Sequence, residues 1–274
     1  MKFPGKFGVL VVDFRHCNYP SGFDLINLTL GSSKLLGLHS DTVQMWLSRP
    51  VEGRIRCGCF AEDARGRWYL NVQLEVPKDG DHGSGEIGID LGLKSLAALS
   101  TGENIEAPRL YRKYERALAI AQHAGRKPRA RAIHAKIANC RKHFLHELST
   151  RLVRQNRRIC IGNVNAGGLA RTRVAKSVLD AGWSQLRSHL HYKAVRHGVE
   201  YVEVDERLTT QVCSACRARG GPQGREDLVV REWICGGCGA WHDRDINSAI
   251  NILISGRNVG LRKTEIPSSV RGRR

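Results

Sequence analysis

The sequence lacks any long apolar run. No stretch reaches the roughly eighteen consecutive apolar residues that a transmembrane helix needs, so we expect no membrane span. The apolar patch at residues 7–12 is interrupted at once by Asp13, and no small-residue cleavage site follows it. We therefore do not interpret this patch as a signal peptide.

Aromatic residues are also scarce, at 6% of the chain. Proteins that read RNA by stacking bases carry aromatic side chains in recognisable motifs, and no such motif occurs here. This scarcity argues against stacking-based RNA recognition.

Acidic residues are the third shortage. Lys and Arg outnumber Asp and Glu by 44 to 26, which gives a formal charge of +18. Such an excess opposes compaction, and nucleic acid, an anionic membrane surface or an acidic protein can balance it. Because the basic residues are spread along the whole chain, a long polyanion such as nucleic acid is the favoured partner. The alternative is a basic protein without a specialised partner.

Nine cysteines are present, an odd number that argues against a disulfide framework. A reducing, cytoplasmic location with a bound metal fits better. Cys213-x-x-Cys216 and Cys235-x-x-Cys238 are separated by eighteen residues. Tetrahedral zinc takes four thiolates at about 2.3 Å, and four protein ligands make a closed, structural site. His242 would be a fifth ligand, so we expect it at the surface or beside the ligands.

The hydrophobic pattern predicts a β-rich N-terminal part followed by an α/β core. Residues 54–60 and 67–76 alternate as strands do. From residue 86 onward, buried-type strands alternate with amphipathic helices, which is typical of a largely parallel sheet.

Residues 109–156 are predicted to form two helices that are split at Lys127-Pro128. The second helix has an apolar stripe at helical spacing. Five basic residues off that stripe are candidate nucleic-acid contacts: Arg129, Arg131, Lys136, Arg141 and Lys142. The alternative is an ordinary solvated helix face.

Two acids suit a magnesium-dependent phosphodiesterase, in which several carboxylates hold two Mg²⁺ ions about 4 Å apart. Asp90 ends an apolar strand between Gly88 and Gly92, which let backbone and ligand come close. Asp245 lies in the first turn of the last helix. Taken singly, each is equally well interpreted as an ordinary turn or helix-N-terminal acid.

Four motifs together resemble the OrfB/TnpB proteins of insertion sequences. They are Gly-Ile-Asp90-Leu-Gly, Asp180-Ala-Gly-Trp183, Thr209-Thr-Gln-Val-Cys213 and His242-Asp-Arg-Asp245. The likeness covers roughly residues 50–255. This family uses a transposon-derived RNA to guide the binding and cleavage of DNA, and it is thought ancestral to the single-protein type V CRISPR effectors.

The resemblance implies an α/β, RNase H-like (RuvC) core with an inserted helical hairpin, an inserted four-Cys zinc ribbon and a β-rich, partial-barrel module before it. The implied divisions are the β module at 1–80, the core at 86–210 with its hairpin at 109–156, the ribbon at 211–241, the last core helix at 242–256 and a basic disordered tail at 257–274.

The resemblance also implies ligands and partners. Asp90 and Asp245 would bind magnesium, and zinc would be structural. The hairpin would lie against nucleic acid. DNA and a guide RNA from the transposon are the expected partners, with no membrane and no small-molecule substrate.

The chain departs from the family at one central position. In the family, the strand at 158–164 carries a catalytic Glu where this chain has Gly162. Glycine cannot bind a metal, and the loss of a ligand shared by two ions lowers a rate by several powers of ten. Glu203 and Asp205, on the next strand, are candidate substitutes. The region before the core is also shorter than in the family.

The favoured hypothesis is therefore a transposon-encoded, RNA-guided DNA-binding protein of the RuvC type whose nuclease is impaired. An active magnesium-dependent endonuclease that uses a substitute acid is the first alternative. A zinc-ribbon protein that binds DNA without a guide is the second. Nothing in the sequence supports strand transfer itself.

Overall fold

The computed structural model describes residues 25–29, 42–46, 53–78, 80–164, 166–169, 171–172, 174–223 and 226–264. The chain divides into two compact units, Met1–Pro77 and Lys78–Arg274. Within the described part of the chain, no helix combines the length and the apolarity needed to span a bilayer.

The described strands of the first unit form two antiparallel pairs. They are β1 (Leu25–Thr29) with β2 (Thr42–Trp46), and β3 (Arg54–Glu62) with β4 (Trp68–Glu75). The carboxylate of Asp63 fixes the β3–β4 turn by accepting the N–H groups of Arg65 and Arg67 at 2.8 and 3.0 Å. The alternation read from the sequence thus does correspond to strands here, whereas closure into a partial barrel stays a prediction.

A five-stranded sheet forms the centre of the second unit, in the spatial order β7-β6-β5-β8-β9. Its strands are β5 (Gly85–Leu91), β6 (Ala97–Leu99), β7 (Asn104–Ile105), β8 (Asn156–Gly162) and β9 (Glu200–Val204). β5, β8 and β9 run parallel, while β6 and β7 are antiparallel additions. The short links between β5, β6 and β7 allow only antiparallel pairing, because a parallel crossover needs a dozen or more residues.

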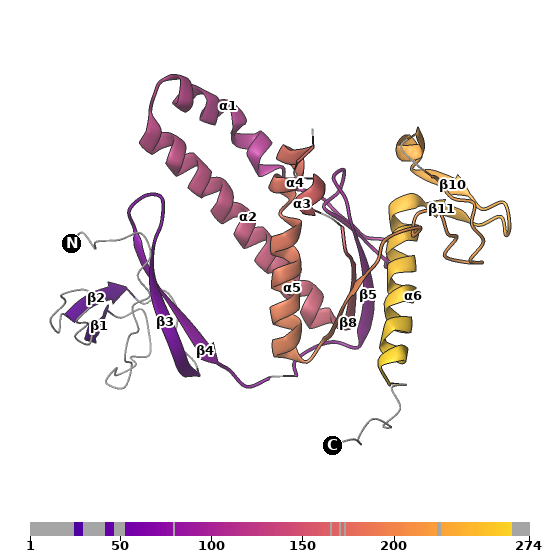
Figure 1. Ribbon diagram of the computed structural model, residues 1–274, viewed down its shortest axis with the longest axis horizontal. Coiled ribbons are helices and arrows are strands. Elements are labelled where there is room, and N and C mark those ends of the chain that lie inside the picture. The colour runs from indigo at the N-terminus through magenta and orange to yellow at the C-terminus, as the bar shows by residue number, and fades with distance from the viewer. Residues whose placement is uncertain are drawn as a thin grey trace, which may run out of the picture. The chain divides into compact units, whose positions relative to one another are not determined.

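Helices cover both faces of this sheet (Figure 1). The helices of the second unit are α1 (Leu110–His123), α2 (Lys127–Gln155), α3 (Ala166–Leu169), α4 (Ala175–Ala181), α5 (Trp183–His197) and α6 (Arg244–Thr264), of which α1 packs on α2. α2 and α5 pack on one face, and α6 packs on the other. Pro128 lies in the first turn of α2, where a missing N–H costs nothing, so it starts the helix rather than breaking one.

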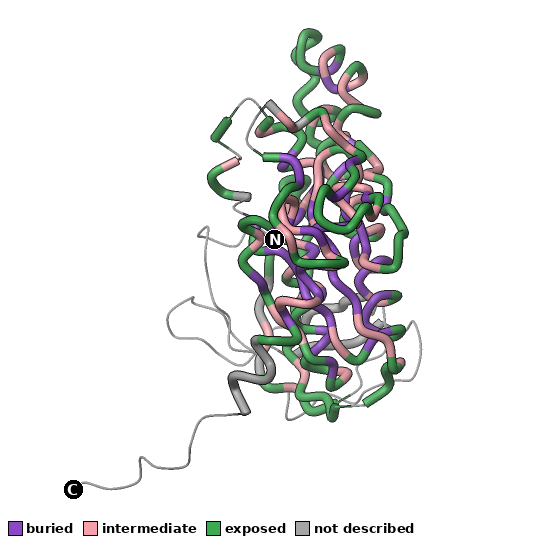
Figure 2. Tube along the Cα trace, turned by 90° about the vertical axis from the view of Figure 1, so that its right-hand side faces the viewer, coloured by how far each residue is buried: buried purple, intermediate pink, exposed green. Residues whose placement is uncertain are grey.

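Side-chain alternation along the strands decides what faces α6. Ile159 and Ile161 belong to the large core with α2 and α5, whereas Cys160 packs against Ile252 and Leu253 of α6. Because successive strand residues point to opposite faces, Gly162 lies on the α6 face. Burial is concentrated in the sheet and the helix faces packed on it, while the far end of the α1–α2 hairpin is largely exposed (Figure 2).

α6 approaches the sheet closely because glycines stand at two contact points. A Cβ on Gly88 would collide with the carbonyl oxygen of Ala249, and a Cβ on Gly256 would collide with Sγ of Cys160. The sequence prediction ended the last helix at Gly256, and this was wrong, since α6 continues to Thr264. Gly256 is needed for close packing, not for termination. The tail from residue 265 lies outside the described residues.

The cysteine pairs lie between β9 and α6. This segment contains a short 3₁₀ helix, η2 (Glu226–Val229), and an antiparallel pair formed by β10 (Glu232–Ile234) and β11 (Trp241–Asp243). The paired strands extend the ribbon to Asp243, just past its predicted end at 241.

Candidate active site and metal centre

The four predicted zinc ligands come together. The sulfur atoms of Cys213, Cys216, Cys235 and Cys238 all lie within 4.8 Å of one another. Two Sγ–Sγ distances are 3.7 Å, between Cys213 and Cys238, and 3.6 Å, between Cys216 and Cys235. Four thiols at this separation can hold a metal such as zinc.

The two Cys-x-x-Cys turns have the same backbone geometry. The residue after each second cysteine has a positive φ, 68° at Arg217 and 71° at Gly239. Its N–H donates to the carbonyl of the first cysteine, at 3.0 Å for Arg217 and 2.8 Å for Gly239. In the second turn, the N–H of Gly237 is the main cause that lowers the pKa of Cys235, to about 7. A low thiol pKa favours the thiolate that binds metal.

His242 is buried beside the cluster rather than placed on the surface. Its Nε2 lies 3.1 Å from Sγ of Cys213, and its ring packs against Trp233 with centroids 4.7 Å apart. It is thus a neighbour of the ligand sulfur, one of the two positions expected for it.

Two asparagines of α6 hold the ribbon to the core. Asn247 donates through its amide to the carbonyl of Val212 at 2.9 Å and accepts the N–H of Ser214 at 2.9 Å. One turn later, Asn251 donates to the carbonyl of Thr209 at 2.8 Å. Both side chains are buried. The sequence analysis did not assign them a role, although their i, i+4 spacing on the last helix was a usable signal.

Asp90 and Asp245 come together where α6 crosses β5. Asp243 fixes the first turn of α6, because its carboxylate accepts the N–H groups of Asp245 and Ile246 at 2.9 Å each. Burial, followed by the negative charges of Asp245 and Glu206, raises the pKa of Asp90 to about 8. A hydrogen bond from Ser248 opposes the shift. The two predicted acids therefore share one electrostatic environment, together with a third that was not predicted.

The predicted substitutes, Glu203 and Asp205, are engaged elsewhere. Glu203 pairs in register with Ile161, so it points to the α5 face, where Tyr201 donates to it at 2.9 Å. Asp205 is exposed and accepts Nε of Arg207 at 3.1 Å. A period of two places Glu203 on the face of the sheet opposite Gly162. The role of Glu203 or Asp205 as a substitute acid stays a prediction.

The residue beside Gly162 is Glu206. A Cβ built on Gly162 would lie 2.9 Å from Oε2 of Glu206. Burial, and then the charge of Asp205, raise the pKa of Glu206. Its side chain lies over the glycine on the α6 face of the sheet.

A ribbon arginine contacts the same site. Nη1 of Arg231 lies 3.2 Å from Oδ2 of Asp245, in a half-exposed ion pair. The metal ribbon and the acid cluster are thus linked through one carboxylate.

Four of the five predicted nucleic-acid contacts are exposed on α2: Arg129, Arg131, Lys136 and Lys142. Arg141 is the exception, with 20% of its side chain exposed and its Nη2 3.0 Å from Oδ1 of Asp180. Both oxygens of Asp180 also accept the N–H of Tyr111, at 3.0 and 2.9 Å. Arg141 and Asp180 thus tie α1, α2 and α4 together, and a contact of Arg141 with nucleic acid stays a prediction.

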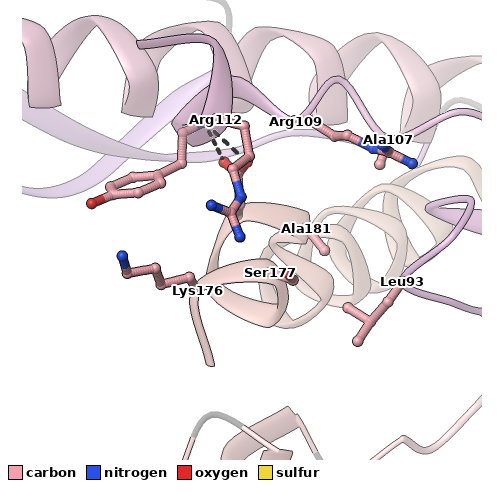
Figure 3. Close-up of a pocket in the computed structure, with 9 residues that line it drawn as sticks. Leu93, Ala107, Arg109, Arg112, Lys176, Ser177 and Ala181 are labelled. Carbon is pink, nitrogen blue, oxygen red and sulfur yellow. Dashed lines mark hydrogen bonds between the residues drawn. The ribbon is translucent and has the colours of Figure 1, made fainter. Parts of the chain in front are cut away.

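Next to this tie lies a basic pocket of about 330 Å³, shown in Figure 3. Arg109 and Arg112 line it from the start of α1, and Lys176 lines it from α4. Glu115 pairs with Arg112 at 3.0 Å and approaches Lys176 at 3.5 Å, which leaves the pocket with more positive than negative side chains.

Two family models match the chain. The OrfB_IS605 model, described as "Probable transposase", matches residues 69–173, and the "Cas12f1-like, TNB domain" model matches residues 183–252. A protein of Streptomyces pristinaespiralis named "Putative RNA-guided DNA endonuclease" is 38% identical over 213 residues. The chain belongs to the OrfB/TnpB family. This family includes the relatives that are named RNA-guided DNA endonucleases and TnpB-like proteins.

The match to the Streptomyces protein covers 72% of this chain and 52% of that protein. The InsQ protein of Escherichia coli (strain K12), named a "Putative RNA-guided DNA endonuclease", is 26% identical, over 77% of this chain and 59% of its own length. This OrfB/TnpB chain thus spans a little over half the length of both relatives.

Solved structures with similar folds include a "Cryo-EM structure of the Cas12f1-sgRNA-target DNA complex". That match has a TM-score of 0.46 and 15% identity, and it covers 86% of this chain and 68% of that one. A CRISPR-Cas12f ternary complex matches with a TM-score of 0.47 and 19% identity, over 72% of this chain and 44% of that one.

Proposed function

We propose that this chain is a transposon-encoded, RNA-guided DNA-binding protein with a RuvC-type, magnesium-dependent nuclease site. The observation that carries the proposal is the meeting of Asp90 and Asp245, which are far apart in sequence, at the crossing of β5 and α6. Relatives bearing the name RNA-guided DNA endonuclease support the guided part of the function.

The sheet supports an RNase H-like assignment for the core. Across the sheet, the antiparallel strands β7 and β6 lie beside the three parallel strands β5, β8 and β9. Strand β5 carries Asp90, and helix α6, on one face of the sheet, carries Asp245. We propose that residues 86–210 form the core and residues 211–241 form the ribbon, and that α6 returns the chain to the core. The β-rich part before the core is proposed as a wedge-like module.

The donor set suits magnesium at one site and zinc at the other. Carboxylate oxygens are the ligands that a hard cation prefers. A cation would offset the burial and the repulsion that together keep the pKa of Asp90 high. When bound, magnesium supplies an activated water and stabilises the leaving oxygen. Asp90 and Asp245 would hold it, and Asp243 keeps Asp245 in place by fixing the turn. Four thiolates suit zinc in a structural role.

Nucleic acid would be held mainly through its phosphates. The exposed basic residues of α2 and the pocket lined by Arg109, Arg112 and Lys176 offer guanidinium and ammonium groups to a backbone. Such contacts carry little sequence information, which suits a system in which guide pairing reads the target.

The sequence predicts an impaired nuclease, because Gly162 replaces the family's central Glu. An active enzyme requires a third carboxylate. Both forms share guided DNA binding, and they differ only in cleavage.

Guided binding is tested with protein expressed together with the DNA that flanks its gene. We expect a discrete RNA to copurify, and we expect the complex to bind DNA that matches this RNA in preference to a scrambled sequence of equal length. Equal affinity for matched and scrambled DNA would contradict guidance and favour the unguided zinc-ribbon alternative. The control is a variant with Arg129, Arg131 and Lys136 changed to Ala, which should weaken binding to both DNAs, because phosphate contacts do not depend on sequence.

A further inference from the structure

We propose that Glu206, in the segment after β9, supplies the third carboxylate of the magnesium site in place of the side chain that Gly162 lacks. This inference rests on the proposed function, because it concerns the metal of that site. It would make the protein an active nuclease rather than an impaired one.

The first support is the fit between Gly162 and Glu206. A Cβ on Gly162 would lie 2.9 Å from Oε2 and 3.5 Å from Cβ of Glu206, and 3.3 Å from Cδ1 of Ile252. The glycine therefore leaves a space between the sheet and α6 that the glutamate fills. A larger residue at position 162 would push Glu206 out, so the two residues are complementary.

The backbone holds Glu206 at this place. β8 and β9 pair in register up to Gly162 and Val204, and the N–H of Asn163 donates to the carbonyl of Val204 at 2.9 Å. The side chain of Asn163 then accepts the N–H of Glu206 at 3.4 Å. Beyond it, the hydroxyl of Thr209 donates to the carbonyl of Glu206 at 2.7 Å. Glu206 is thus anchored to the end of β8 on one side and to the ribbon segment on the other.

The face of the sheet is also the right one. Val204 packs on the α6 side with Cys160 and Ile252, and residues two apart in an extended chain share a face. The side chain of Glu206 is therefore on the same face of the sheet as that of Val204, whereas the side chains of Glu203 and Asp205 are directed to the opposite face.

Charge is the second, independent support. The negative charges of Asp245 and Glu206 both act on Asp90, so three carboxylates lie within electrostatic range of one another in a partly buried place. Like charges in such a place are unfavourable unless a proton or a cation neutralises them. A hard divalent cation with oxygen ligands is the neutraliser that this donor set suits.

Metal binding would draw the three groups closer. Among the described residues, only the four cysteines already place their ligand atoms within 4.8 Å of one another. The glutamate side chain has three rotatable bonds and can reach toward the aspartates from a fixed backbone.

The experiment compares Glu206→Gln with the wild type and with Glu203→Gln, a matched control on the same segment that faces away. Mn²⁺ replaces Mg²⁺ as the probe, and its binding to the purified, zinc-loaded protein is followed by electron paramagnetic resonance. We expect Glu206→Gln to weaken Mn²⁺ binding about tenfold or more, with the same melting temperature and guide-RNA content as the wild type. Glu203→Gln should match the wild type.

Guided cleavage of DNA is the second readout. Glu206→Gln should lose activity by several powers of ten, whereas Glu203→Gln should keep it. The double variant Gly162→Glu with Glu206→Gly returns the carboxylate to the strand and should restore both metal binding and cleavage in part.

Two results overturn the proposal: Mn²⁺ affinity unchanged by Glu206→Gln, or a wild type that binds no more Mn²⁺ than Asp90→Asn does. Failure of guidance is visible separately, since it alters RNA content and target preference but leaves the Mn²⁺ comparison intact. Loss of Mn²⁺ affinity in Glu206→Gln supports the role of Glu206 whether or not a guide binds.

Discussion

At the scale of single residues, the second unit contains several titratable side chains whose pKa values are shifted by folding. His189 is one outside the acid cluster. Its ring stacks on that of His146, with centroids 3.9 Å apart, and its Nε2 is buried without a hydrogen-bond partner. Burial, followed by the charges of His146 and Lys193, lowers the pKa of His189 from 6.5 to about 4.

This shift gives a stability prediction with a definite sign. Below pH 6.5, His189 binds a proton in the unfolded chain but not in the folded one, until the pH approaches 4. The free energy of unfolding should therefore fall as the pH falls through this window. His189→Phe should remove part of the fall, on the order of 1 kcal/mol after allowance for solvent screening.

Urea denaturation at pH 7 and at pH 4.5 measures the difference. His134→Phe is the control, because His134 is exposed on α2 and should leave the pH dependence as it is in the wild type. An equal loss of stability in His189→Phe and wild type would show that another group causes it.

Residues of the candidate site were predictable where a strong sequence pattern indicated the direction of the side chain. Asp90 follows an apolar strand and Asp245 opens an amphipathic helix, so both could be placed on facing elements. Glu206 lies two residues beyond the end of β9, where no strand pattern in the sequence marks it. The signal for it was parity, since Val204 and Glu206 are even-numbered like Gly162, and pairing of β8 with β9 in that register places them together. The register itself depends on tertiary packing and was not readable from the sequence.

At the scale of elements, the seating of α6 on the sheet decides the geometry of the site. The helix carries Asp245 in its first turn and rests on β5 at Gly88. A side chain at position 88 would push the helix away from Asp90, because the colliding atom is a backbone oxygen that cannot rotate aside.

Gly88→Ala should therefore destabilise the protein by about 3 kcal/mol, at the upper end of overpacking costs, and weaken divalent-metal binding as well. Gly220→Ala is a suitable comparison, since a Cβ at Gly220 meets nothing within 4 Å. Thermal melting and metal titration of the two variants measure both effects. Two equally stable variants would mean that α6 shifts without cost.

Element types were largely predictable, but element ends were not. The hairpin over 109–156, the strands of the core and the start of α6 all follow from periodicity and from punctuation such as Lys127-Pro128. The end of α6 was misjudged because a glycine that ends a helix and a glycine that permits close packing look identical in sequence. Only the contact of Gly256 with Cys160 distinguishes them.

At the scale of the whole molecule, the ribbon is built into the route by which the chain returns to its core. Asn247 and Asn251 donate to backbone carbonyls before the first cysteine turn, and Asn247 accepts the N–H of Ser214 within it. Both side chains are buried. Loss of the metal should therefore disturb α6 as well as the ribbon.

Removal of zinc with a strong chelator should lower the melting temperature of the whole second unit, not merely release a local loop. Cys216→Ser should have the same effect without chelator. Hydrogen exchange along α6 is the decisive measurement: faster exchange after metal removal is expected, and unchanged exchange in α6 would mean that the ribbon folds independently.

The contact between Arg231 and Asp245 has a consequence for exchange at the site. The guanidinium of Arg231 partly neutralises the carboxylate of Asp245, so Arg231 and a metal ion would compete for this carboxylate. Entry of the ion would free Arg231, and departure of the ion would recapture it. The position of Arg231 in the ribbon would then depend on whether metal is bound at the acid site, although the ribbon contributes no ligand to that site.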